Sequence, residues 1–245
     1  YAPSAYDRSV FFVGPCFPPQ ARPDAQQPAD DDVIAWMDKM HAEGRRVVCI
    51  NMGTIYYYQP QDYAHMVQAL HMIHEQNPNV AFLWKIAQRP KHVQNIPSED
   101  EAALPPYVRR LSWIPSMTAV MEHPALAVMM HHGGGNSLNE CLAYGIPQFC
   151  ISQWVDTHDI GLCIRHSGVG LWSEYSPDFV PEDICSQLLQ LVEDKDHKFR
   201  HTALLWKPKA AEACGPKFAA DLIQSYVTDY TYAGGSSKAP MPHAM

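Results

Sequence analysis

The chain has 245 residues, 47% of them hydrophobic, which is enough for a globular α/β protein with a sizeable core. Its formal net charge of −8 argues against nucleic acid or an anionic membrane as the main partner, because both attract basic surfaces. No run of about 18 apolar residues predicts a transmembrane segment. The seven cysteines form no C-x-x-C pair and indicate free thiols in a reducing, cytoplasmic compartment.

The two ends of the chain differ in composition from its middle. Residues 1–30 are rich in proline around one short β-type run at 10–13, and we expect a linker between domains whose strand reaches a sheet edge. Residues 231–245 lack core-forming side chains and predict a disordered tail. Residues 31–230 would form one domain. Since Tyr1 is neither an initiator Met nor part of a signal-like segment, we expect a piece of a longer protein or a processed form.

Strands and helices alternate through most of this domain. We expect strands at 47–51, 80–86, 108–113, 125–130, 147–151 and 168–171, and helices at 33–40, 61–76, 116–122, 135–144 and 157–166. A long loop at 87–107 carries a short turn of helix at 98–104, and helices follow at 182–193, 195–212 (kinked at Pro208) and 217–230. The alternation and the apolar strands predict a doubly wound, Rossmann-like parallel sheet of about six strands with helices on both faces.

The most informative stretch is His132–Ser137, which follows an apolar strand and opens a helix. Glycines at 133–135 allow a ligand to approach the backbone, and the free N–H groups and dipole of the helix that begins at Asn136 and Ser137 favour an anion. His132 adds a further hydrogen-bond donor. The pattern predicts a phosphate or diphosphate site, although a tight structural turn fits a glycine-rich strand-to-helix connection equally well.

Three further side chains fall near the same edge of the predicted sheet. Glu140 lies four residues after Asn136, where its carboxylate could accept hydrogen bonds from a ribose or stay a solvated helix charge. Trp113 ends a strand and is either a platform for a base or a core residue. Asp156 lies in the loop after the next strand, where it could bind a sugar hydroxyl, cap the following helix, or do both.

Taken together, these residues resemble the donor-binding signature of the family 1 UDP-glycosyltransferases of the GT-B superfamily. The matching elements, in order, are Val13-Gly14-Pro15, Trp36-Met37-Asp38, Asn51-Met52-Gly53-Thr54, Phe82-Leu83-Trp84, Trp113, His123-Pro124, His132 to Glu140, Gly145-Ile146-Pro147 and Asp156-Thr157. The resemblance covers roughly residues 10–230. It implies the C-terminal half of a GT-B fold and binding of UDP and a UDP-sugar without a metal or cofactor.

The resemblance also implies a role for each matched residue. Trp113 would stack on uracil and the backbone of Ile114 would read its edge. Glu140 would bind the ribose. The diphosphate would lie against the glycine turn and the turn after the first strand, and the sugar against the next loop. The residues expected at the diphosphate are Thr54, His132, Gly134, Asn136 and Ser137. Those expected at the sugar are Gly135, Asp156 and Thr157.

The sequence departs from the family pattern at three places. Gly135 replaces a Trp, Thr157 replaces a Gln, and Ser116 or Met117 stands where a Gln is usual. These departures point to a fungal or microbial branch. They also leave the identity of the transferred sugar open. Glucose is the default, and glucuronic acid, N-acetylglucosamine and others are alternatives.

In this family the acceptor pocket and the catalytic His–Asp pair belong to an N-terminal domain, which would precede Tyr1. We therefore assign no catalytic residue to this chain. We expect the donor-binding half of an inverting, metal-independent transferase that acts on small lipophilic acceptors and is inactive in transfer alone. Its last helix, after Pro208, would pack on the missing half. A stand-alone donor-binding subunit of a two-chain enzyme, or a non-catalytic nucleotide-sugar module, remain the alternatives.

Overall fold

The computed structural model of the chain describes residues 31–90, 95–97, 104–212 and 215–232. The predicted linker at 1–30 with its short strand, most of the helical turn expected at 98–104, and the tail beyond residue 232 lie outside the described residues.

Six strands and eight helices make up the described chain. The strands are β1 (Arg46–Asn51), β2 (Val80–Lys85), β3 (Val108–Leu111), β4 (Leu126–His131), β5 (Gln148–Cys150) and β6 (Gly170–Trp172). The helices are α1 (Asp31–Ala42), α2 (Pro60–Gln76), α3 (Met117–Glu122), α4 (Gly135–Tyr144), α5 (Val155–Ser167), α6 (Pro181–Glu193), α7 (Lys198–Glu212) and α8 (Gly215–Tyr232).

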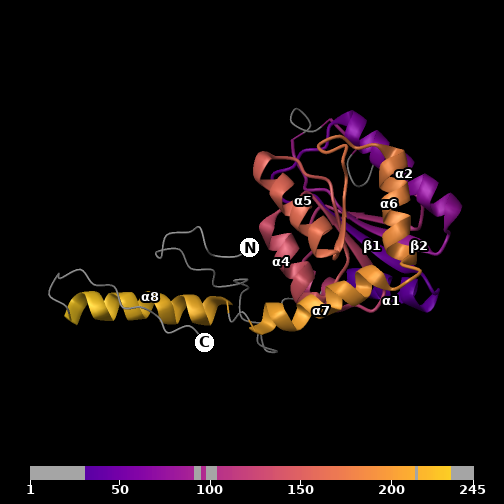
Figure 1. Ribbon diagram of the computed structural model, residues 1–245. Coiled ribbons are helices and arrows are strands. Elements are labelled where there is room, and N and C mark those ends of the chain that lie inside the picture. Colours follow the sequence, from indigo (N-terminus) through magenta and orange to yellow (C-terminus); the bar gives the residue numbers. More distant parts are fainter. Residues whose placement is uncertain (1–30, 91–94, 98–103, 213–214, 233–245) are drawn as a thin grey trace.

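The strands form one parallel sheet in the order β3-β2-β1-β4-β5-β6 (Figure 1). The chain starts in the middle of the sheet, builds outward to β3, and returns to β4 on the other side of β1. This is the doubly wound arrangement, so the predicted fold class is confirmed. Strand order reverses between β1 and β4, and their carboxyl ends meet at residues Asn51 and His131.

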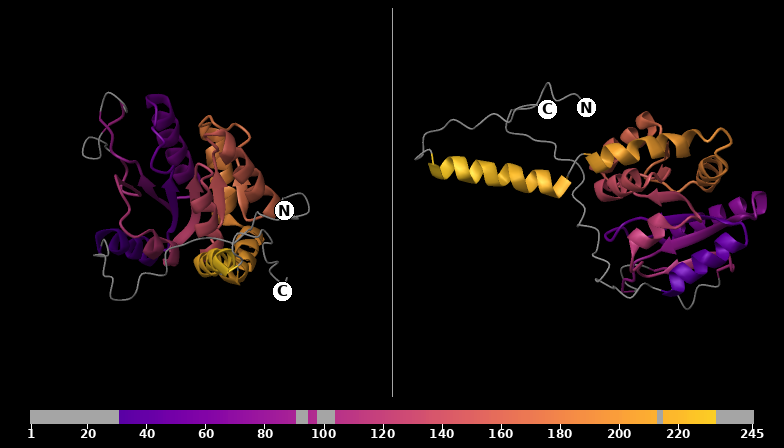
Figure 2. Two further views of the ribbon diagram at one scale, coloured as in Figure 1. Left: turned by 90° about the vertical axis from the view of Figure 1, so that its left-hand side faces the viewer. Right: turned by 90° about the horizontal axis from the view of Figure 1, so that it is seen from below.

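Side chains of the central strands alternate between two cores. Val48 and Ile50 pack with α2 and α6 on one face of the sheet, whereas Val47 and Cys49 pack with α1, α3 and α4 on the other. A smaller cluster beneath α5 contains Cys150, Ile164 and Val169. Burial on both faces explains why the strands are continuous apolar runs. The layers are visible in Figure 2.

Several predicted boundaries were wrong. β3 ends at Leu111, so Trp113 lies in the loop beyond it. α5 starts at Val155 rather than Thr157, which places Asp156 in its first turn instead of at its cap. α7 starts at Lys198 rather than at 195, because the Asp194 carboxylate accepts hydrogen bonds from the backbone N–H groups of Phe199 and Arg200, at 3.1 and 2.9 Å.

The C-terminal helices leave the sheet. α7 continues through Pro208 and packs against α4, where the backbone of Leu204 reaches Gly145. α8, yellow in Figures 1 and 2, extends away from the layered body. Its apolar side chains Phe218, Ile223 and Val227 are exposed. Within the described ranges, no helix combines the length and the hydropathy that crossing a bilayer requires.

Candidate functional site

The turns that follow β1 and β4 are in contact through His132. A Cβ atom added to Gly53 would lie 2.7 Å from Cε1 of this ring, and one added to Gly134 would lie 2.8 Å from Cε1 and Nε2. Gly53 also has a positive φ of 87°, a conformation that glycine adopts without strain. The imidazole is thus held between two glycine backbones at the point where strand order reverses, which is where doubly wound folds bind their ligands.

His132 is held neutral. Burial lowers the pKa of His132, and the positive charge of Lys85 lowers it further, while Asp156 opposes the shift. The ring packs edge-on against Trp154, with ring centroids 5.2 Å apart. Its Nδ1 is buried and has no hydrogen-bond partner among the described residues. An unpaired polar atom is costly at such a position unless a ligand completes it.

His131, one residue earlier, forms a hydrogen bond with the backbone of this turn. It is fully buried, its Nδ1 accepts a hydrogen bond from the backbone N–H of Gly133 at 3.1 Å, and its Nε2 donates to Oε1 of Gln148 at 2.9 Å. Burial lowers the pKa of His131 to about 4. His131 is therefore a hydrogen-bonded core residue beneath the glycine turn.

Helix α4 begins where the sequence predicts, at Gly135, and ends at Gly145, whose φ of 68° is the expected left-handed conformation. Its first turn presents Asn136 to solvent, while Ser137 is buried. Glu140 is half-buried, and burial raises the pKa of its carboxyl. No atom lies within 4 Å of a Cβ placed on Gly135, so the position of the family's Trp is open space.

The loop between β5 and α5 is organised by Thr157. Its hydroxyl accepts hydrogen bonds from the N–H groups of Gln153 and Trp154, at 3.0 and 2.9 Å, and donates to the Trp154 carbonyl at 2.6 Å. Thr157 is 2% exposed. The structure therefore gives this hydroxyl an internal role as a helix cap and does not present it to a ligand. Asp156 beside it is exposed and close enough to His132 to affect its pKa.

Trp113 and Ile114 have opposite environments. Ile114 is buried, with 5% of its surface exposed. Trp113 is 59% exposed, so it is not the core residue that the sequence analysis kept as an alternative. The Nζ of Lys85 lies 4.8 Å from the centroid of the Trp113 ring. The indole is thus held against a cation with much of its surface available for stacking. Ser116, one of the two candidates for the position of the family's Gln, caps α3 by accepting a hydrogen bond from the N–H of Ala119.

Sequence reasoning missed two cations at this edge, Lys85 and Arg89. Lys85 ends β2, and its Nζ contacts both Oδ1 of Asn51 and the carbonyl oxygen of Gly53, each at 3.3 Å. Arg89 donates a hydrogen bond to the backbone carbonyl of Thr54, and Thr54 is exposed. One signal in the sequence could have identified Lys85: a charge closing the otherwise apolar strand run of β2.

Other landmarks of the resemblance have structural roles. The Nε2 of His123 lies 3.1 Å from Oδ1 of Asp38, which joins two motifs that are far apart in the sequence. The indole N–H of Trp84, which is buried, donates to the hydroxyl of Tyr58 at 3.0 Å. In the described chain, no group of three or more His, Cys, Asp and Glu side chains has the arrangement of a metal site.

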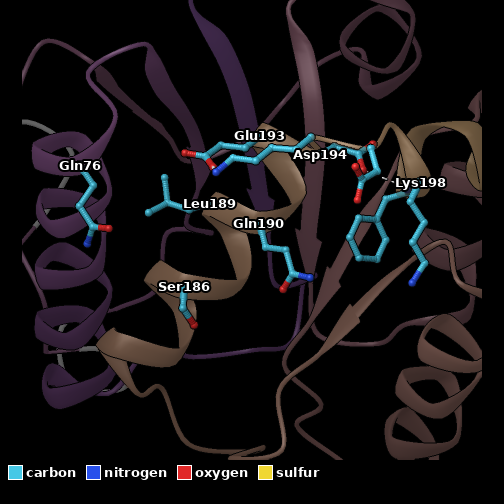
Figure 3. Close-up of a pocket in the computed structure, with 10 residues that line it drawn as sticks. Gln76, Ser186, Leu189, Gln190, Glu193, Asp194 and Lys198 are labelled. Carbon is cyan, nitrogen blue, oxygen red and sulfur yellow. Dashed lines mark hydrogen bonds and ion pairs between the residues drawn. The ribbon is translucent and has the colours of Figure 1, made fainter.

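A separate cavity of about 540 Å³ lies between the ends of α2 and α6 and the start of α7 (Figure 3). These helix ends lie at the amino edge of the sheet, away from His132. Two of the charges there have partners within the fold: Lys195 lies 3.3 Å from Glu193, and Asp194 caps α7. This cavity lacks the unpaired polar atoms found at the carboxyl edge.

Known proteins resemble this chain in sequence and in fold. The chain is 26% identical over 272 residues to erythritol-mannosyl-transferase 1 of Mycosarcoma maydis, covering 86% of this chain and 43% of that protein. It is 28% identical over 234 residues to a limonoid UDP-glucosyltransferase of Citrus unshiu, covering 89% and 44%. Its fold matches a UDP-glucose:anthocyanidin 3-O-glucosyltransferase solved with UDP, with a TM-score of 0.62 and 22% identity over 78% of this chain and 41% of that one.

The chain therefore spans less than half the length of the relatives that it resembles. A family model described as erythromycin biosynthesis protein CIII-like, C-terminal domain, matches residues 91–224, which is more than half of the chain. The six-stranded parallel sheet and these relatives confirm the resemblance to UDP-glycosyltransferases and the GT-B type of fold. The chain belongs to the erythromycin biosynthesis protein CIII-like C-terminal domain family, and the relatives that it matches are named as glycosyltransferases.

Proposed function

We propose that this chain binds the UDP-sugar donor, in the first instance UDP-glucose, of an inverting and metal-independent glycosyltransferase. The observation that carries the proposal is the neutral, half-buried His132, which lies between Gly53 and Gly134 at the start of α4 with an unpartnered Nδ1. A diphosphate at this point would accept hydrogen bonds from the ring and from the free N–H groups of α4.

The other predicted residues extend this position into a nucleotide-sugar site. Trp113, exposed beyond β3, stacks on the base beside the backbone of Ile114. Glu140 binds the ribose from α4. The diphosphate contacts Thr54, Gly134, Asn136 and Ser137 as well as His132. Asp156 and the backbone of Gly135 face the sugar. Thr157 acts indirectly, by capping the helix that carries Asp156.

In the transfer step, an acceptor oxygen bonds to the anomeric carbon as the bond from that carbon to the β-phosphate oxygen breaks. The electron pair remains on the departing UDP, and donors at the N-terminus of α4 stabilise that charge without a metal. The acceptor's proton passes to a base outside this chain. An N-terminal acceptor domain of the same cytoplasmic enzyme would supply it, together with a pocket for a small lipophilic acceptor.

A mannosyl donor is the second candidate, because the relative from Mycosarcoma maydis is named for mannose transfer to erythritol. The open space at Gly135, where the family's Trp would stand, removes one constraint on the sugar. Thermal unfolding of the chain with equal concentrations of UDP-glucose, UDP-glucuronic acid, UDP-N-acetylglucosamine and GDP-mannose ranks these donors, since a ligand bound only by the folded state raises the melting temperature more when it binds more tightly.

Isothermal titration calorimetry with UDP tests the proposal directly. We expect saturable binding that is unchanged by EDTA, and no sugar transfer by the chain alone. Absence of saturable binding of UDP or GDP to the folded protein contradicts a donor site. Loss of binding on adding EDTA contradicts metal independence. An N-terminal Rossmann domain encoded upstream in the same open reading frame would exclude a stand-alone subunit. Absence of turnover after joining that natural N-terminal half would favour a non-catalytic module.

A further inference from the structure

The carboxyl edge of the sheet holds a buried lysine without an anionic partner. Lys85 is 5% exposed, and its two hydrogen-bond contacts, to Asn51 and to the carbonyl of Gly53, are both 3.3 Å long, at the weak end of the range. Among the residues that the structure describes, no carboxylate lies within ion-pair distance of its Nζ. A buried ammonium without a counter-ion is costly, so such a position indicates an anion that arrives from outside.

The surroundings of Lys85 are those expected for a nucleotide diphosphate. Its Nζ lies 4.8 Å from the Trp113 ring, the base platform, and contacts the turn of Gly53, which also packs against His132. Lys85 therefore lies between the places assigned to the base and to the phosphates.

A second cation strengthens the positive field. Arg89 hydrogen-bonds the Thr54 carbonyl on the same turn, and its Nε is buried without a hydrogen-bond partner among the described residues. Burial lowers the pKa of Lys85, and the charge of Arg89 lowers it further. Two cations that repel each other across one turn would both be stabilised by an anion placed between them.

We propose that Lys85 binds the diphosphate of the nucleotide-sugar donor and stabilises the negative charge that grows on it as the sugar departs. This inference rests on the proposed function. Lys85 donates a hydrogen bond and keeps its proton throughout, while the electron pair of the broken sugar–oxygen bond stays on the β-phosphate. In a site without a metal, a buried ammonium supplies the charge that a divalent cation would otherwise provide.

A purely structural role predicts a different pattern. If Lys85 only supported the Trp113 ring and the Gly53 carbonyl, its loss would weaken the base and ribose contacts and would affect UMP and UDP equally. A contact with the diphosphate instead affects UDP more than UMP. The ratio of the two affinities therefore separates the two roles.

The experiment compares UDP and UMP binding to the chain and to its variants Lys85→Gln, Lys85→Met and Lys85→Arg by calorimetry. Lys85→Gln keeps hydrogen-bond donors for Asn51 and Gly53 but removes the charge, and we expect it to weaken UDP binding by about ten- to a hundredfold and UMP binding by less than about threefold. Lys85→Arg should retain UDP affinity within about threefold. The control Lys39→Met removes a charge from an exposed, ion-paired side chain of α1 and should change neither affinity.

The outcomes are distinguishable. If wild-type protein binds UDP and Lys85→Gln leaves the UDP-to-UMP ratio unchanged, the role of Lys85 is overturned while the donor site stands. If wild-type protein binds neither UDP nor GDP, the proposed function fails and the role of Lys85 with it. Should Lys85→Met not fold, Lys85→Gln and Lys85→Arg still decide, because both retain polar contacts with the turn.

Discussion

A Cβ atom on Gly53 would lie 2.7 Å from Cε1 of His132, closer than real side chains approach each other. The turn after β1 and the turn after β4 are thus fitted to one another with no room for a methyl group. This contact joins two segments almost eighty residues apart in the sequence and fixes where the imidazole lies relative to the start of α4. We expect both the stability of this edge and the proposed ligand binding to depend on this contact.

Gly53→Ala should be damaging, because it combines a positive φ of 87° with the clash against His132. We expect a loss of about 1–3 kcal/mol in the free energy of unfolding, measured by urea denaturation, together with weaker UDP binding. Gly135→Ala is the matched control: its Cβ meets nothing within 4 Å and lies in a helix, so it should leave stability unchanged or raise it by up to about 1 kcal/mol. Equal effects of the two substitutions would argue against the fitted turn.

Thr157→Val should destabilise the loop that carries Asp156. The substitution keeps the shape of the side chain but removes the hydroxyl that accepts from the N–H groups of Gln153 and Trp154. We expect a cost of about 1–3 kcal/mol in urea unfolding, whereas Thr157→Ser, which keeps the hydroxyl, should cost less. If Thr157→Val lowers sugar affinity without lowering stability, Thr157 contacts the sugar directly after all.

Stability should fall in acid because His131 is buried in its neutral form. Its pKa is lowered from 6.5 to about 4 in the folded protein, so between these values the unfolded chain binds more protons. The stabilisation is complete above about pH 6.5 and is lost as the pH falls toward 4, by up to about 1.4 kcal/mol per pH unit. Its neighbour His132 contributes with the same sign, because burial lowers its pKa too.

Urea unfolding at pH 7.5, 6.5, 5.5 and 4.5 measures this dependence. His131→Asn removes the titrating group and should flatten the curve, at the expense of stability at neutral pH. His197→Asn, which replaces an exposed histidine on the turn before α7, is the control and should leave the slope unchanged. A slope that survives in His131→Asn would assign the acid sensitivity to other groups.

His132→Ala and Glu140→Ala should each weaken UDP binding by about 1–3 kcal/mol, because each removes a hydrogen bond to a charged or buried group of the ligand. Neither should unfold the protein, since both side chains are only partly buried. Glu43→Ala, which removes an exposed carboxylate at the end of α1, is the control and should leave the affinity unchanged. Calorimetry on the three variants checks this. Full UDP affinity in both site variants would place the nucleotide elsewhere.

The sequence by itself determined the class of fold, and it predicted a place for the site. The continuous apolar strands, alternating with helices, predicted a parallel sheet. Such a sheet is covered by helices on both faces, so its strands have apolar side chains on both sides. Helix α4 was predicted with its observed bounds, since a glycine turn opens it and Gly145 ends it in a left-handed conformation. These sequence patterns are local: each depends on the backbone of a few consecutive residues, so the prediction does not require the tertiary structure.

The tertiary structure alone decided which side chains at the carboxyl edge of the sheet are engaged in internal hydrogen bonds and which are not. In sequence, Thr157 occupies a position that the resemblance assigns to ligand binding. In the structure, its hydroxyl is hydrogen-bonded to the backbone N–H and carbonyl of Trp154. Lys85 reads as the end of a strand, yet pairing of β2 with β1 and β3 places its Nζ between Gly53 and the exposed Trp113. Such roles depend on atoms from strands that are distant in the chain, and a one-dimensional pattern carries no information on the distances between them.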